Sequence, residues 1–403
     1  MDEASGTFAA DGAAGTAQRL RAVIKEVSGR FFERDEVVRT LVVTLLAGQH
    51  SLLLGPPGSA KSELARELAG RIEDSRYWEI LLSKFTPPTK IFGPVDVGAL
   101  ALGEYRQVFD GRATTADVGF VDEIFKCSTA ALNEMLAYLN ERLYHPESGG
   151  APIPCPLIGA ITASNELPSG EDSAAIYDRL LVRLEVDYLT DPANFAALIR
   201  SATAASAPTV RTTVTLKELK AAVATAVPAV LVPEVIVDTI GALRAALRRE
   251  GLIASDRRWR QSVRLMQASA WLDGRTEVGE HDVAVLIHVL WDSPTERRLV
   301  ERQVLDLIDP EGKEALDLEE ALDDLEAQWA AKDGQAAEDV SNWVITEARR
   351  KLNRTGKDLE KLREAAVAAG RSTTVVDRVL GRQQSLLHRI VSEVLGVSVG
   401  TGK

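Results

Sequence analysis

The feature that most restricts the fold of this chain is a glycine- and proline-rich loop between an apolar run and a helical segment. Residues 51–54 are mostly apolar, which is typical of a buried parallel strand. The run Gly-Pro-Pro-Gly at 55–58 can neither continue that strand nor begin a helix. Residues 61–69 then combine good helix formers with apolar residues three and four positions apart. The sequence therefore predicts a strand, a tight loop and a helix in direct succession.

A loop of this kind is suited to binding phosphate groups. Its backbone N–H groups point inward and the helix N-terminus adds positive potential, so a triphosphate fits there. We expect the ammonium group of Lys61 to reach the β- and γ-phosphates, and the hydroxyl of Ser62 to hold Mg²⁺. The predicted nucleotide-binding residues are Gly55, Pro56, Pro57, Gly58, Ser59, Ala60, Lys61 and Ser62. An ordinary strand–turn–helix corner is the alternative interpretation, and the flanking strand and helix patterns argue against it.

One position departs from the common phosphate-loop pattern. Glycine usually stands directly before the lysine, and this chain has Ala60 there. Alanine fits that place if its φ angle is negative, as at the start of a helix. We therefore expect helical backbone geometry at Ala60.

A second and a third apolar run each end in polar side chains. Residues 118–121 lead into Asp122 and Glu123, about sixty residues after the loop, and the run from 157 ends at Asn165. Ligands bind outside the carboxyl ends of strands in an open α/β sheet. There Asp122 is expected to hold Mg²⁺ through water, and Glu123 to polarise the water that attacks the γ-phosphate. Asn165 would orient that water. Solvated strand ends and a turn asparagine are the alternatives.

The length of 403 residues predicts two or three domains. We expect a disordered N-terminus at 1–16, an α/β core at 17–190, a helical lid at 191–308 without parallel strands, and a helical extension at 309–403. In that extension, residues 311–324 are acidic and residues 347–363 are rich in lysine and arginine. We interpret them as a hairpin of two antiparallel helices of opposite charge. Solvated faces explain their charges, and docking of a partner is the other interpretation.

Composition excludes several classes of function. The net charge of −12 argues against a nucleic-acid surface, which is usually basic. Cys127 and Cys155 are too few for a disulfide framework or a zinc site, and they fit a reducing cytosol. The N-terminus lacks the pattern of a signal peptide, and no stretch has eighteen uninterrupted apolar residues. We therefore expect a cytoplasmic protein with no membrane segment.

Taken together, these motifs resemble those of MoxR-type AAA+ ATPases, and most closely the RavA branch. The resemblance spans roughly residues 17 to 300 and is most specific in its first two thirds. The matching stretches are 55–62, 85–88, 91–94, 120–126, 139–142, 163–168 and 177–180, with weaker matches at 255–259 and 267–270.

The resemblance implies an α/β fold: a P-loop AAA+ core with a parallel sheet between helices, followed by an all-α lid. It also implies a ring, usually hexameric, with ATP at each subunit boundary. Asp122 and Glu123 would be the Walker B acids, Asn165 sensor 1, Arg179 the arginine finger, and Arg257 sensor 2, with Arg258 as the alternative. The insertion at 87–112 and the hairpin at 143–156 would face the pore.

The resemblance further implies a partner with a von Willebrand factor A domain and chaperone-like maturation of protein clients. The alternative is a nucleotide-gated scaffold with little turnover, although the intact Glu123 argues against it. A nucleic-acid motor is disfavoured by the acidic charge. For Arg179, the alternative is a structural salt bridge to Asp178 or Glu185.

Overall fold

A parallel sheet of five strands forms the centre of the computed structural model, which describes residues 3–146, 149–168, 170–203, 211–332, 336–369 and 371–395. The strand order is β3-β4-β7-β1-β8, and every neighbouring pair is parallel. The bounds are β1 Ser51–Leu54, β3 Tyr77–Leu81, β4 Val118–Asp122, β7 Gly159–Ser164 and β8 Val182–Glu185. Leu54 at the end of β1 is in register with Ser164 and Glu185, so the carboxyl ends meet at one edge.

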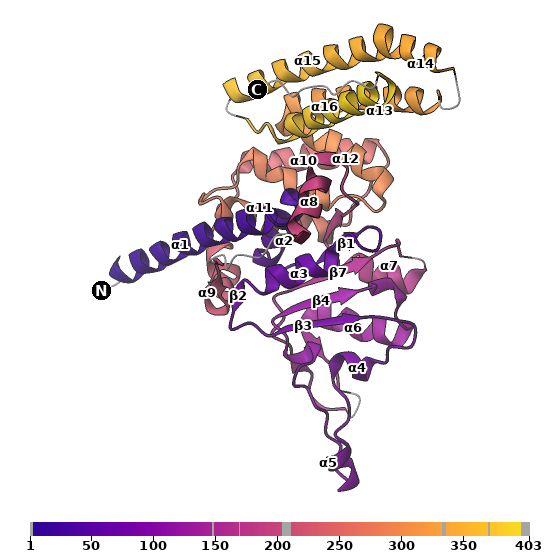
Figure 1. The fold of residues 1–403 in the computed structure, drawn as a ribbon. Coiled ribbons are helices and arrows are strands. Elements are labelled where there is room, and N and C mark those ends of the chain that lie inside the picture. The colour runs from indigo at the N-terminus through magenta and orange to yellow at the C-terminus, as the bar shows by residue number, and fades with distance from the viewer. Residues whose placement is uncertain are drawn as a thin grey trace.

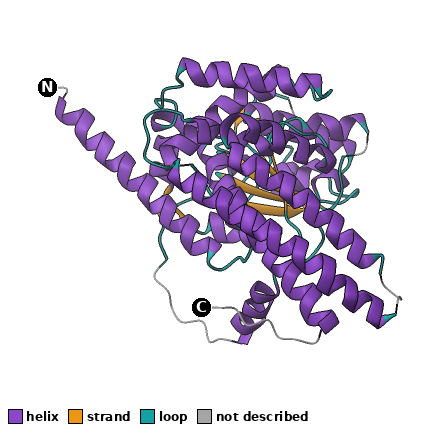
Figure 2. Cartoon of the chain, turned by 90° about the horizontal axis from the view of Figure 1, so that it is seen from above, coloured by secondary structure: helices purple, strands orange, loops and turns teal. Residues whose placement is uncertain are grey.

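Helices cover the sheet, which confirms the predicted α/β fold class. Every residue of β1 and β7 is buried, as expected for central strands of a parallel sheet covered on both faces. Figure 2 shows the strands lying beneath helices. The covering elements are α2 (Asp35–Leu46), α3 (Lys61–Ala69), α6 (Thr129–Glu141), α7 (Glu171–Tyr177) and the short 3₁₀ turns Ala113–Thr115 and Ile124–Lys126.

The N-terminal segment differs from the expectation of disorder at 1–16. Residues 3–16 form the first half of α1 (Glu3–Ser28), and residues 1–2 lie outside the described residues. The second half of α1 packs on the core through Ala17, Leu20 and Val23. The preceding stretch is rich in alanine, the best helix former, so it continues a helix that packing has already started. In Figure 1 this end of α1 projects away from the body.

Two inserted segments extend from the sheet, as the sequence predicted. The insertion at 87–112 contains α4 (Pro88–Phe92) and α5 (Val97–Ala101), and its arms meet at an antiparallel bridge between Val95 and Gln107. Figure 1 places α5 at the far tip of this insertion. The hairpin at 143–156 pairs β5 (Leu143–Tyr144) with β6 (Ile153–Pro154) in antiparallel register.

The region after residue 190 is mostly helical, but the expectation that it holds no parallel strand was wrong. Its helices are α8 (Pro192–Thr203), α9 (Leu216–Ala221) with a π-helical turn at Ala222–Ala226, α10 (Glu234–Arg249), α11 (Asp256–Leu272), a 3₁₀ helix at Glu280–His288 and α12 (Pro294–Ile308). Between them, β9 (Val214–Thr215) pairs in parallel with β2 (Ile72–Glu73). Lys220 on α9 also forms an ion pair with Asp117 at 2.7 Å. These contacts attach residues 214–221 to the α/β core.

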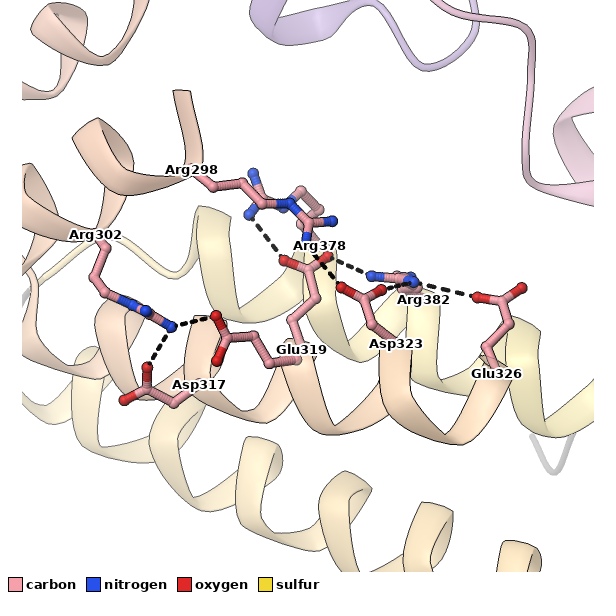
Figure 3. A network of polar contacts seen from close by, with 9 residues as sticks. Arg298, Arg302, Asp317, Glu319, Asp323, Glu326, Arg378 and Arg382 are labelled. Carbon is pink, nitrogen blue, oxygen red and sulfur yellow. Dashed lines mark hydrogen bonds and ion pairs between the residues drawn. The ribbon is translucent and has the colours of Figure 1, made fainter. Parts of the chain in front are cut away.

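The C-terminal region is a helical bundle in which the acidic helix and the basic helix pack on each other, although the acids form their ion pairs with other helices. It comprises α13 (Pro310–Ala330), α14 (Ala337–Trp343) with a π-helical turn at Val344–Ala348, α15 (Arg349–Ala368) and α16 (Thr374–Leu395). Among the described residues, the acids of α13 form ion pairs with arginines of α12 and α16 and none with the basic segment 347–363. Figure 3 shows this network, in which Arg298, Arg302, Arg378 and Arg382 contact Asp317, Glu319, Asp323 and Glu326.

Among the described residues, the structure contains no helix with the length and apolar character needed to cross a bilayer.

Candidate functional site

The candidate site lies at the edge of the sheet where the carboxyl ends of β1, β4 and β7 meet. The loop 55–60 follows β1, Asp122 ends β4, and Asn165 follows β7. Because the three strands are adjacent and in parallel register, their ends bring these side chains together. The arrangement is the one that the sequence predicted.

Gly55 begins the loop at a place where only glycine fits. Its φ angle is 158°, a value that L-residues rarely adopt, and the space for a side chain is also closed. A Cβ atom there would stand 2.1 Å from the carbonyl oxygen of Val186. The chain after β8 therefore passes directly against the start of the loop.

Lys61 holds the loop from inside. Its Nζ donates to the carbonyl oxygens of Gly55 at 2.7 Å and Pro56 at 2.8 Å, and it contacts Asn165 Oδ1 at 3.3 Å. The residue is only 7% exposed. Burial lowers the pKa of Lys61, although the charges of Asp122 and Glu123 oppose that shift. Among the described residues no carboxylate comes within ion-pair distance of this ammonium group. A buried cation held by neutral oxygens fits a phosphate ligand.

Ala60 does not have the helical backbone that we expected. Its φ and ψ angles are 66° and 21°, in the left-handed region, and α3 begins only at Lys61. Such a conformation costs an L-residue about 1–2 kcal/mol, which explains why glycine is common at this place. The loop must turn sharply to enter α3, and the surrounding structure imposes that turn on alanine.

The acids lie beside the first turn of α3. Ser62 Oγ is 3.4 Å from Asp122 Oδ2, so a hydroxyl and a carboxylate face the same point. Hard oxygen ligands of this kind suit Mg²⁺, which keeps most of its water and binds one or two protein groups. Glu123 follows in a left-handed conformation with φ of 55°. Its Oε1 accepts from Asn165 Nδ2 at 2.9 Å, which joins the acid to the amide.

Two further residues contact the site, and sequence reasoning missed them. Lys126 Nζ lies 3.2 Å from Glu123 Oε2. The spacing of three residues on one helical turn was a usable signal for that pair. Tyr188 donates its hydroxyl to the carbonyl oxygen of Pro57 at 2.9 Å. No sequence pattern indicated this contact, because it depends on the path of the chain after β8.

Arg179 lies away from this edge. It stands just before β8, whose first residue Val182 is in register with Ser51, the first residue of β1. The loop follows the other end of β1, so the two are separated by the length of a strand, about 13 Å at 3.3 Å per residue. Arg179 Nη1 donates to the carbonyl oxygen of Ala175 at 2.6 Å. Burial and the charge of Arg257 lower the pKa of Arg179.

The predicted alternative for Arg179, a salt bridge to Asp178 or Glu185, is not formed. Asp178 faces Arg258 at 3.3 Å and Arg257 at 3.8 Å, and Glu185 faces Arg297 at 3.7 Å. Within the described ranges Arg179 forms no ion pair with any acid.

Arg257 and Arg258, the two sensor 2 candidates, differ in their surroundings. Arg258 is buried and forms ion pairs with Asp178 and, at 2.6 Å, with Asp292. Arg257 is 31% exposed and donates to Asn140 Oδ1 at 2.7 Å. Arg258 thus holds the helix in place, whereas Arg257 presents its charge near Arg179. The structure brings Lys61, Ser62, Asp122, Glu123 and Asn165 together, but not Arg179 or Arg257.

Comparison with known proteins gives consistent matches. Residues 18–223 match the family model described as the MoxR domain in the MoxR-vWA-beta-propeller ternary systems, and residues 235–304 match the AAA lid domain. Two uncharacterized proteins of Methanocaldococcus jannaschii are each 30% identical to this chain. Each alignment covers 90% of this chain and, respectively, 94% and 95% of the relative.

A crystal structure gives a match at the level of the fold. It is that of a candidate ATPase from Cytophaga hutchinsonii, which superposes with a TM-score of 0.62 at 17% sequence identity. The match covers 76% of this chain and 98% of that one.

Proposed function

The chain belongs to the MoxR family of AAA+ ATPases, and from that premise we propose that it hydrolyses ATP at the edge formed by β1, β4 and β7. The observation that carries the proposal is the convergence of Lys61, Ser62, Asp122, Glu123 and Asn165 from three neighbouring strands. Bound Mg²⁺ would neutralise phosphate charge, held by Ser62 and Asp122. Lys61 would contact the β- and γ-phosphates, while the loop residues 55–60 surround them with backbone N–H groups.

Glu123 is the group that we assign to the attacking water. Its carboxylate is held on one oxygen by Asn165 and on the other by Lys126, so its direction is set before substrate binds. A general base must be oriented toward the proton that it accepts. Asn165 would orient the water. It would also contact the γ-phosphate and so couple the presence of that phosphate to β7, the strand that Asn165 follows.

Arg179 and Arg257 suggest that the complete site is shared between two copies of the chain. Both arginines lie at the edge of the sheet away from Lys61 of their own chain, and both are close to each other. The phosphate that they would reach is therefore one bound to a neighbouring copy. We infer a closed ring, hexameric as in the family, with Arg179 as arginine finger and Arg257 as sensor 2.

Our proposal for the client and the partner is based on the family, because the residues of the site do not indicate either. The matched family model is named for systems that contain a vWA protein, which supports a von Willebrand factor A domain partner and remodelling of protein complexes. The RavA-like branch rests on the loop sequence at 55–62 with Ala60 before Lys61. The described part of 309–403 contains helices and no strand. Turnover measured with and without the partner separates a remodeller from a nucleotide-gated scaffold.

Glu123→Gln tests the catalytic assignment. The amide keeps the shape but cannot accept a proton, so we expect normal ATP binding and turnover slowed about 10²- to 10⁴-fold. ATP affinity is measured by calorimetry and turnover by phosphate release. Glu166→Gln changes an exposed acid next to Asn165 and serves as the matched control. Wild-type turnover in Glu123→Gln would remove Glu123 from the mechanism.

Mixing two inactive variants tests whether the site is shared. Lys61→Ala has a defective pocket and an intact finger, and Arg179→Ala has the reverse. Each variant alone should be inactive. Lys61→Ala lacks a working pocket, and Arg179→Ala lacks the finger, which contributes a factor of about 10³–10⁵ to the rate. Mixed rings contain boundaries where both halves are intact, so part of the activity should return. If mixed rings form, as native mass spectrometry can show, and activity stays absent, Arg179 does not act across the boundary.

A further inference from the structure

The outermost helix of the molecule presents a row of positive charge to solvent. Figure 1 places α15 farthest from the sheet. Arg350, Arg354, Lys357 and Lys361 are spaced by four, three and four residues, which puts them on one side of that helix. All of them are exposed. We call these residues the basic stripe. It is a local feature, since the whole chain has a net charge of −12.

The stripe is only weakly neutralised by its own chain. Arg354 and Lys361 share the carboxylate of Asp358, at 3.9 Å and 3.1 Å. In the described part of the chain, Arg350 and Lys357 form no ion pair. The side of α15 that faces the bundle core, with Leu352 and Leu359, lies opposite to the stripe. Packing of the bundle therefore does not require these charges.

A groove runs beside the stripe, between α15 and α13. Its volume is about 420 Å³. The lining residues are Glu314, Asp317 and Leu318 from α13, and Asp358, Lys361 and Leu362 from α15. The two leucines are half-buried against the bundle core, so part of their surface is open. The groove thus has an apolar floor and acids along the α13 wall, whereas its α15 wall carries Asp358 and Lys361, the one residue of the basic stripe that lines it.

We propose that this groove binds an amphipathic helix of another protein, with acidic side chains along one edge and basic side chains along the other. The apolar face of that helix would cover Leu318 and Leu362 and add a helix to the bundle. Its acidic edge would face the basic stripe, and its basic edge would face Glu314 and Asp317. A single ligand would then contact the leucines of the floor, the α13 acids and the bases of the stripe that lie beside the groove.

The charge layout favours a helix over other anionic partners. A nucleic-acid duplex or an anionic membrane is a wide surface that would meet the α13 acids as well as the stripe. Glu314 is exposed, and among the described residues Asp317 forms one ion pair, with Arg302 at 3.0 Å. A helix is narrow enough, at about 10 Å, to present opposite charges to the two walls. The proposal does not depend on ATP hydrolysis, because no residue of the nucleotide site is involved.

The test uses the full chain and a fluorescent synthetic helix with leucines on one face, glutamates along one edge and lysines along the other. Binding is followed by fluorescence anisotropy at low and high salt. We expect saturable binding by the wild type that weakens with salt. The double variant Arg354→Glu, Lys357→Glu should bind at least about tenfold more weakly, since two attractive contacts become repulsive. A peptide with glutamine in place of glutamate should show a similar loss.

Arg349→Glu is the matched control, because Arg349 is exposed on the same helix but lies on a different side from the stripe. It should bind the peptide as the wild type does. Unchanged circular dichroism and ATP turnover would show that the double variant is folded. Equal binding by the wild type and the double variant, or no binding at all, would overturn the proposal. So would stripe-dependent binding to duplex DNA or to phosphatidylserine vesicles without binding to the peptide, or self-association that the double variant abolishes.

Discussion

The backbone of Ala60 in the phosphate loop is strained. With φ of 66°, its Cβ atom is held in a conformation that glycine adopts at little cost. Ala60→Gly should therefore stabilise the core by about 0.5–1 kcal/mol, the relief of strain exceeding the added entropy of the unfolded chain. The measurement is the midpoint of urea unfolding, followed by circular dichroism.

A second alanine nearby supplies the control for that substitution. Ala65 is fully buried within α3, in ordinary helical geometry. Ala65→Gly should destabilise the protein by about 1 kcal/mol, because glycine is a poor residue for a helix interior. If the two substitutions shift the midpoint in the same direction, the left-handed strain at Ala60 contributes nothing measurable.

Asp117 joins two elements that are far apart in the sequence. Its buried carboxylate accepts from Lys220 of α9 at 2.7 Å and from the backbone N–H of Arg76 at 3.1 Å. Asp117→Asn keeps the shape and removes the charge that these donors face. We expect a loss of about 1–3 kcal/mol in the free energy of unfolding at pH 7. Asp110→Asn, at an exposed acid, should cost nothing measurable.

The pH dependence of that difference follows from the pKa of Asp117. Burial raises it, but the hydrogen bonds from Lys220 and Arg76 outweigh burial, so the folded pKa lies below the ordinary value of 3.8. A lowered folded pKa stabilises the protein fully above the unfolded pKa, and this contribution is lost as pH falls through the folded value. The difference between wild type and Asp117→Asn should therefore shrink below about pH 4. A constant difference from pH 7 to pH 3 would contradict the assignment.

At the scale of the whole molecule, the C-terminal bundle has a hydrophobic core of its own. Leu322, Leu352 and Leu386 belong to a cluster that is distinct from the cluster of the ATPase core and lid. Ion pairs contribute to the connection between α12 and the bundle: Arg298 with Asp323 at 2.8 Å is exposed, whereas Glu301 is buried and pairs with Arg378 at 2.9 Å. Exposed ion pairs of this kind stabilise by at most about 1 kcal/mol each.

Ending the chain at Asp309 should therefore leave a folded ATPase. We expect ATP turnover close to that of the full chain and loss of binding to the synthetic helix. Size-exclusion chromatography, phosphate release and anisotropy give the three measurements. An insoluble or inactive truncated chain would show that the bundle is needed to hold α12 and the lid in place.

The sequence by itself determined the sheet, the loop and the acids of the site. Local patterns carry that information: an apolar run predicts a buried strand, and a polar residue at its end predicts where the side chain will point. Parallel strands bring their carboxyl ends to one edge, so Lys61, Asp122 and Asn165 could be placed together without knowledge of the packing. Glycine was required at Gly55, and the loop pattern already indicated it.

The tertiary structure alone decided the remaining features, because each depends on contacts between distant segments. The φ angle of Ala60 follows from closing the loop against α3, and no local preference predicts it. The strand β9 has two residues, too few to show a period, and it exists only because β2 lies beside it. In the C-terminal bundle, two basic segments could have paired with the acids of α13. In the packed bundle the arginines of α16 pair with these acids, and the bases of α15 face outward. The free energy gained by burying leucines exceeds that of exposed ion pairs, so burial sets the orientation of the helices.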